Sequence, residues 1–151
     1  MAPVTLAGAT DGRDLLIGTA SDEVINGVPV GSVLNGRGSY DTLTGKGGND
    51  LFILGTASAV FYDDGISTSS GATDLAAITD FTAGDRIQLH GTATEYRLAS
   101  GRVSGSAGVM LYRLNPSVGS TPGATDELIG FIKGLTPANL NLADSSQFLY
   151  V

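Results

Sequence analysis

Four carboxylates recur at multiples of nine residues in the first third of the chain: Asp14, Glu23, Asp41 and Asp50, with Ser32 at the intervening position. Carboxylate oxygens are ligands that Ca²⁺ prefers, and one ion takes six to eight oxygens at about 2.3–2.6 Å. Closely stacked carboxylates repel one another unless a cation lies between them. The spacing therefore predicts calcium binding. The alternative is a solvated edge on which these acids only face water.

Two further registers accompany the acids and predict the elements that must position them. Each nine-residue unit opens with one of Ala9, Gly18, Gly27, Gly36 and Gly45. A large apolar residue stands two positions after each of these five acid positions, and the same nine-residue spacing continues once more. These residues are Leu16, Ile25, Leu34, Leu43, Phe52 and Phe61. Glycine-rich turns let several backbone carbonyls point at one spot. The apolar residue would be the inward-facing centre of a very short strand, so we expect two parallel sheets around an apolar ladder.

The fourth and fifth units, residues 36–44 and 45–53, resemble the calcium-binding nonapeptide of RTX (hemolysin-type) proteins, G-G-x-G-x-D-x-U-x. The third unit, residues 27–35, carries Pro29, Val30 and Ser32 where that pattern has Gly, Gly and Asp. The sixth, residues 54–62, keeps only its apolar Phe61. The resemblance implies a parallel β-roll over about residues 8–62.

By the same resemblance, each ion draws on backbone carbonyls and acids of two stacked loops, with unit n lying above unit n+2. Only the second and fourth units then offer two acids, Glu23 and Asp41. We expect one to three ions in the roll, held by Asp14, Glu23, Asp41 and Asp50 and by turns containing Gly12, Gly18, Gly36, Gly38, Gly45, Gly47 and Gly48.

The second half, about residues 63–151, has fewer glycines and longer apolar–polar alternations. A strand that ends near Asp80 and Phe81 precedes a turn and a second strand, as in the segment that follows the nonapeptides of many RTX modules. The resemblance implies one more calcium site, with Asp74 and Asp80 as ligands and Asp63 or Asp64 as further candidates. Ordinary turn aspartates are the alternative.

Further strands are predicted over residues 95–98, 109–114 and 128–132. They would fold as an antiparallel β-rich cap over the open end of the roll, which would otherwise expose unpaired backbone. Much of this half looks like the carboxy-terminal module of cyanobacterial RTX-type proteins. We therefore expect an all-β chain with a single domain over residues 1–151.

The last eight residues, 144–151, place an acid before a short apolar end. This tail resembles the uncleaved carboxy-terminal signal of type I secretion; the compatible alternative is a last β-strand. The amino terminus has neither a cationic start nor an apolar run, so no Sec-type signal is expected there. With no cysteine in the chain, these features predict a secreted or cell-surface protein that uses a type I secretion channel.

Composition excludes several classes of function. The net charge of −7 disfavours binding to nucleic acid or to an anionic membrane, and no stretch approaches the ~18 apolar residues of a membrane helix. His90 is the only histidine, and no nucleophile–base pair stands out. We expect no enzymatic activity.

Two functions from different classes remain. The first is a calcium-binding module that folds on meeting extracellular Ca²⁺ and supports export or stability of itself or of a parent protein. The second is a non-catalytic module of a secreted enzyme or adhesin that binds polysaccharide or a surface, with Arg13, Arg37 and Lys46 as the cations that would meet an acidic sugar chain.

Overall fold

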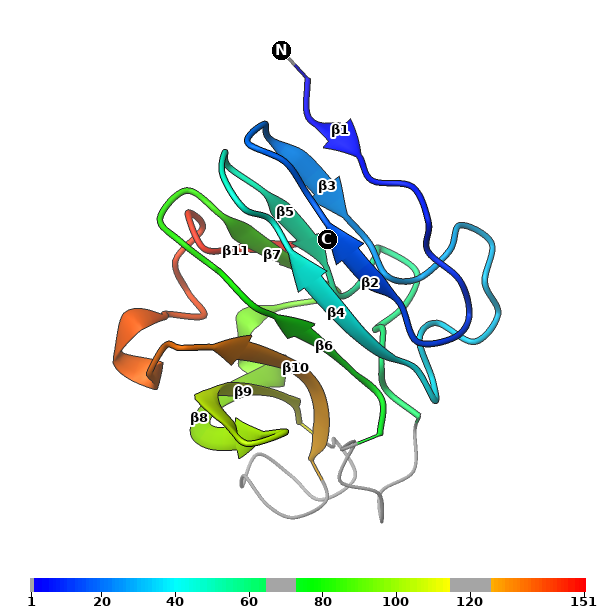
Figure 1. The fold of residues 1–151 in the computed structure, drawn as a ribbon. Coiled ribbons are helices and arrows are strands. Elements are labelled where there is room, and N and C mark those ends of the chain that lie inside the picture. The colour runs from blue at the N-terminus through cyan, green and yellow to red at the C-terminus, as the bar shows by residue number, and fades with distance from the viewer. Residues whose placement is uncertain (1, 65–72, 115–125) are drawn as a thin grey trace.

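The computed structural model describes residues 2–64, 73–114 and 126–151, and in these ranges nearly all regular structure is β-strand (Figure 1). The strands are β1 (Val4–Thr5), β2 (Leu15–Ile17), β3 (Glu23–Ile25), β4 (Tyr40–Thr44), β5 (Leu51–Ile53), β6 (Leu75–Ile78), β7 (Arg86–Leu89), β8 (Tyr96–Val103), β9 (Ser106–Arg113), β10 (Glu127–Lys133) and β11 (Phe148–Tyr150). Two short 3₁₀ helices are η1 (Ala93–Glu95) and η3 (Pro137–Asn139). None of the helices in these ranges has the length and apolar character that crossing a bilayer requires.

Successive strands from β2 to β7 alternate between two sheets. The first sheet has the order β1-β3-β5-β7-β11, and every pair in it is parallel. The second has the order β2-β4-β6-β10-β9-β8, parallel as far as β10 and antiparallel beyond it. The expected all-β fold, a parallel roll followed by antiparallel strands, is confirmed.

The expected stacking of unit n on unit n+2 is wrong. Leu16 pairs with Leu43 and Ile25 with Phe52, so the first unit stacks on the fourth and the second on the fifth. The third unit forms a loop instead of a strand, and Leu34, expected in the core, is 40% exposed. Pro29 fixes φ near −65° where the repeat pattern has a glycine, so this unit does not make the same turn.

Two apolar ladders that run across the sheets lie at the centre of the main core cluster. In the first sheet the ladder is Ile25, Phe52, Ile87 and Phe148; in the second it is Leu16, Leu43, Ile78 and Ile132. All eight side chains are buried in one cluster. Burying each contributes about 1.5–3 kcal/mol. The nine-residue apolar register therefore sets the interior, apart from its third member.

The antiparallel part of the chain continues the second sheet of the roll beyond β6. β10 pairs with β6 in parallel, and the β8–β9 hairpin continues the second sheet from β10. The tail strand β11 pairs with β7 and completes the first sheet (Figure 1). This arrangement brings the start of β10 to the same region as the chain that leaves the roll after Tyr62.

Candidate metal centre

The roll acids are tied to the backbone of the neighbouring layer. Asp41 Oδ1 accepts the Asp14 N–H at 2.9 Å, and Asp50 Oδ1 accepts the Glu23 N–H at 2.9 Å. The Asp50 N–H is accepted in turn by Asp85 Oδ1, also at 2.9 Å. The acids therefore form two stacked columns, Asp14 with Asp41 and Glu23 with Asp50 and Asp85. We call Asp14 and Glu23 the first layer and Asp41 and Asp50 the second. In each column a carboxylate accepts the backbone N–H of the acid in the preceding layer.

The first-layer acids are also held by threonines of their own turns. Asp14 accepts the N–H and hydroxyl of Thr10 at 2.7 and 2.8 Å. Glu23 accepts the N–H of Thr19 at 3.0 Å and also the Thr19 hydroxyl. These bonds hold Asp14 and Glu23 at the turns of their own units.

Burial leaves the second-layer acids poorly suited to a negative charge. Burial raises the pKa of Asp41 even though Tyr62, Ser39 and the Asp14 amide donate to it. Burial raises the pKa of Asp50 to about 6, and the neighbouring charges of Asp85 and Glu23 add to this increase. A cation beside these columns would relieve the same repulsion.

The glycines of the pattern make room for the stacked acids. A Cβ on Gly45 would lie 2.1 Å from Asp50 Oδ2, and one on Gly48, whose φ is +97°, would lie 2.5 Å from the Ser21 backbone. A Cβ on Gly18 would lie 2.4 Å from Glu23 Oε2, and one on Gly36 would lie 2.8 Å from the Tyr62 ring. By contrast, Gly12, Gly38 and Gly47 have space around them. The carbonyls of Gly12 and Gly36 accept bonds from Ser39.

Asp80 lies at the roll and not beside Asp74. Its two oxygens accept the N–H groups of Gly45 and Lys46 at 2.9 and 2.7 Å. It therefore anchors the turn of the fifth unit. The expectation that Asp74 and Asp80 share one site is not met by this arrangement.

Three other acids converge where the roll meets the antiparallel strands. Asp63, Asp64 and Glu127 each place one carboxylate oxygen within 4.8 Å of the others, the single such three-residue group found in the described ranges. We call these three residues the acid cluster. Asp63 and Asp64 follow the last nonapeptide, and Glu127 opens β10. Glu127 is only 5% exposed, so its charge is poorly hydrated.

Two carboxylate oxygens at this place have no hydrogen-bond partner: Glu127 Oε1 and Asp74 Oδ1, both buried. Burial raises the pKa of Glu127 to about 8, with further increases from the charges of Asp64, Asp74 and Asp63. Burial likewise raises the pKa of Asp74. Buried oxygens without a partner and several like charges are the donor set that a hard divalent cation such as Ca²⁺ requires.

Sequence reasoning named Asp63, Asp64 and Asp74 but missed Glu127. Glu127 stands 63 positions after Asp64 and outside the repeats. The local signal was an acidic pair, Asp126-Glu127, directly before the apolar run 128–132. That signal does not say which distant acids the strand will meet.

The fold and these residues define a β-solenoid with a candidate divalent-cation centre at the end of its repeats. No family model matches the chain, and no curated protein matches it. Among solved structures, the solution structure of the AlgE6R3 subunit from the Azotobacter vinelandii mannuronan C5-epimerase is similar, at 19% identity over 94% of this chain and 87% of that one, with a TM-score of 0.45. A likeness at this level assigns neither a family nor a ligand.

Proposed function

We propose that this chain is a non-catalytic, Ca²⁺-binding β-roll module in which the acid cluster, with Asp74 beside it, holds one ion. The observation that carries the proposal is the unpartnered, buried Oε1 of Glu127 within reach of two further carboxylates. Calcium supplies a double positive charge and accepts irregular oxygen shells. These residues would supply carboxylate oxygens from three separate segments of the chain.

Calcium binding at this place would couple to folding. Asp63 and Asp64 directly follow the repeats, and Asp74 directly precedes β6. Glu127 is the first residue of β10, so an ion bound by all four would fasten β10 to the roll. An ion that binds the folded form and not the unfolded form stabilises it by mass action. The stacked acids Asp14, Glu23, Asp41 and Asp50 would bind one to three further ions, as the repeat pattern predicts.

The same coupling supports export as the cellular role. At low cytosolic calcium the chain would stay unfolded and could pass through a type I secretion channel, and millimolar calcium outside would fold it. The buried position of Phe148 supports this order of events, because β11 is part of the first sheet once the chain has folded. A tail signal would be accessible to a channel only before that step. We therefore propose a secreted or cell-surface location.

A calcium titration of chelated protein tests the proposal, with far-UV circular dichroism for folding and isothermal calorimetry for binding. We expect saturable heat and a cooperative gain of β signal between micromolar and millimolar Ca²⁺, which Mg²⁺ at the same concentration does not reproduce. Protein that shows neither heat nor a gain of β signal up to 10 mM Ca²⁺, about ten times the dissociation constant of the weakest extracellular modules, would contradict it.

One observation favours the second function, binding of an acidic polysaccharide. The Arg13 guanidinium lies 4.9 Å from the centre of the Tyr40 ring, a cation and an aromatic ring together at the roll surface. Arg37 is less suited, because its guanidinium donates to the Val33 and Leu34 carbonyls. Affinity for an anionic polysaccharide that falls with salt, and that Arg13→Gln weakens, would support this function.

A further inference from the structure

We propose that Glu95 draws the Arg113 guanidinium to the edge of the acid cluster, where it meets only Asp63 at ion-pair distance, and thereby sets the affinity of that cluster for a divalent cation. The inference rests on the proposed function, because it concerns the same cluster. It assigns a role to an ion pair that lies outside the repeats and outside the candidate ligands.

Arg113 on β9 lies directly opposite Glu127 on the adjacent strand β10. In the ladder of β8, β9 and β10, Tyr96 pairs with Arg113 and Arg113 pairs with Glu127. Residues directly opposite one another in antiparallel strands project from the same face of the sheet, with Cβ atoms about 4.5–5.5 Å apart. Arg113 therefore starts from a position from which a flexible guanidinium can reach the cluster.

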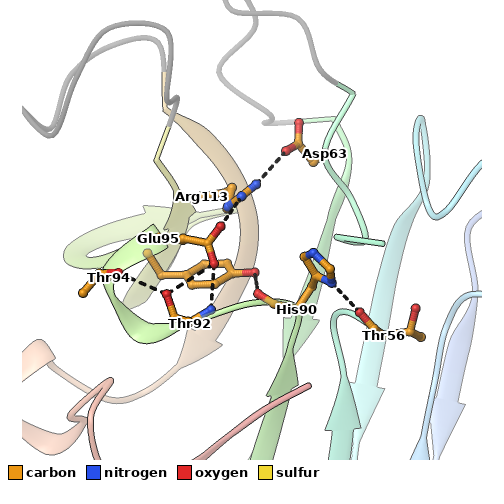
Figure 2. A network of polar contacts seen from close by, with 8 residues as sticks. Thr56, Asp63, His90, Thr92, Thr94, Glu95 and Arg113 are labelled. Carbon is orange, nitrogen blue, oxygen red and sulfur yellow. Dashed lines mark hydrogen bonds and ion pairs between the residues drawn. The ribbon is translucent and has the colours of Figure 1, made fainter. Parts of the chain in front are cut away.

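The guanidinium is nevertheless bonded elsewhere. Arg113 Nη2 donates to Glu95 Oε1 at 2.7 Å, whereas Nη1 is 4.0 Å from Asp63 Oδ2, beyond hydrogen-bond distance (Figure 2). The Arg113 hydrogen bond lowers the pKa of Glu95, so this pair is ionised. Glu127 Oε1 stays without a partner. Arg113 thus makes its hydrogen bond to Glu95, which is not in the cluster, and only a longer 4.0 Å ion pair to Asp63, which is.

Glu95 is itself held in place. It is the third residue of η1, and its Oε2 accepts the Thr92 N–H at 2.7 Å in a capping box (Figure 2). Oε1 remains for Arg113. Because the capping bond fixes the carboxylate, Glu95 is a positioning residue. It holds the guanidinium at the edge of the cluster, in ion-pair distance of Asp63 only, and leaves Glu127 Oε1 without a partner.

Removing the Glu95 charge should release Arg113 toward Asp63 and Glu127. A resident cation there would neutralise part of the charge that attracts a metal ion and would have to be displaced by it. Removing Arg113 should do the opposite. The two single substitutions therefore shift metal affinity in opposite directions, and in the double variant the loss of Glu95 has no cation left to release.

The test measures Ca²⁺ affinity by calorimetry, with Tb³⁺ luminescence as a second probe, for wild type, Glu95→Gln, Arg113→Gln and the double variant. Glutamine can keep the capping bond to Thr92. We expect about tenfold weaker binding for Glu95→Gln and several-fold tighter binding for Arg113→Gln, the scale of one partly screened charge. The double variant should bind like Arg113→Gln alone.

Arg97→Gln is the matched control. Arg97 lies on β8 next to Tyr96, so it projects from the opposite face, where it stacks on Tyr112 and donates to Asp126 at 2.8 Å. The Ca²⁺ affinity of the Arg97→Gln variant should differ from wild type by less than twofold. A change as large as that of Arg113→Gln would overturn the inference. Unchanged binding in Glu95→Gln, or a double variant as weak as Glu95→Gln, would overturn this inference alone. Wild-type protein that binds no calcium would overturn the proposed function as well.

Discussion

The Tyr62 hydroxyl donates a 2.6 Å hydrogen bond to Asp41 Oδ2, and both side chains are completely buried in the roll. Tyr62 ends the sixth nonapeptide, which has lost its own acid, and Asp41 belongs to the fourth. The tyrosine of the sixth unit therefore supplies a hydrogen-bond donor to the buried carboxylate of the fourth. This pair offers a way to measure how strongly the roll depends on its acids being paired.

We expect Tyr62→Phe to lower the free energy of unfolding by about 1–3 kcal/mol, because it leaves a buried carboxylate oxygen without its donor. Urea unfolding at saturating Ca²⁺ measures the change. Tyr40→Phe is the control, since Tyr40 is only half-buried, and it should change stability by less than about 0.5 kcal/mol. Equal effects of the two substitutions would show that the Tyr62–Asp41 bond contributes little.

The two leucines Leu34 and Leu43 occupy the same position of successive repeats but should respond differently to truncation. Leu43 is fully buried, so Leu43→Ala should cost about 2–5 kcal/mol. Leu34 lies in the loop, and Leu34→Ala should cost under about 1 kcal/mol. Denaturant unfolding of both variants measures the two losses. Similar losses of stability would show that Leu34 is buried in the core like Leu43.

Two glycines separate backbone strain from steric contact. Gly38 and Gly48 both have positive φ, but a Cβ on Gly38 meets nothing within 4 Å, whereas one on Gly48 meets the Ser21 backbone at 2.5 Å. Gly38→Ala should cost about 1–2 kcal/mol from strain alone. Gly48→Ala should cost clearly more, about 3 kcal/mol or above. Thermal unfolding ranks them, and the reverse order would contradict the close approach of these turns.

Glu127→Gln should weaken calcium binding at the acid cluster at least tenfold, because it removes a buried candidate ligand whose Oε1 has no other partner. Isothermal calorimetry measures the affinity. Asp11→Asn is the control, as it removes an exposed carboxylate that accepts from Ser32 at the turn of the first unit. Comparable losses in both variants would indicate a general effect of net charge instead of a site.

Metal-free protein should become less stable as the pH rises from about 5 to about 8. Burial raises the pKa of Glu127 from its ordinary value of 4.5 to about 8 in the folded protein, and that of Asp50 from 3.8 to about 6. A raised pKa means that the folded form keeps a proton which the unfolded form has lost, so stability falls with pH in this window.

The β signal in far-UV circular dichroism against pH in chelator measures the effect, because the folded fraction of calcium-free protein follows its stability. In Glu127→Gln the decline between pH 6 and 8 should largely disappear, and the variant should keep more β signal than wild type at pH 8. Saturating Ca²⁺ should flatten the wild-type curve in the same range. A wild-type β signal that rises from pH 5 to 8 in chelator would contradict the burial of these charges.

Much of the roll could be predicted from local pattern. Leu16, Ile25, Leu43 and Phe52 alternate with turn residues at short range, and an apolar residue at the centre of a three-residue strand has only one way to leave water. The acids Asp14 and Asp50 follow from the same repeat. Stacking could not be predicted in this way, since pairing of repeats depends on whether every unit can form a turn, and Pro29 prevents the third from doing so.

The all-β class, the apolar residues of the ladder and the turns that carry the acids could be read from the sequence, because each nonapeptide repeats the same local pattern. The pairing of β10 with β6, which places Glu127 beside Asp63 and Asp64, could not. Nor could the ion pair of Arg113 with Glu95. The physical reason is distance along the chain: these side chains meet through strand pairing between remote segments, which no local periodicity encodes.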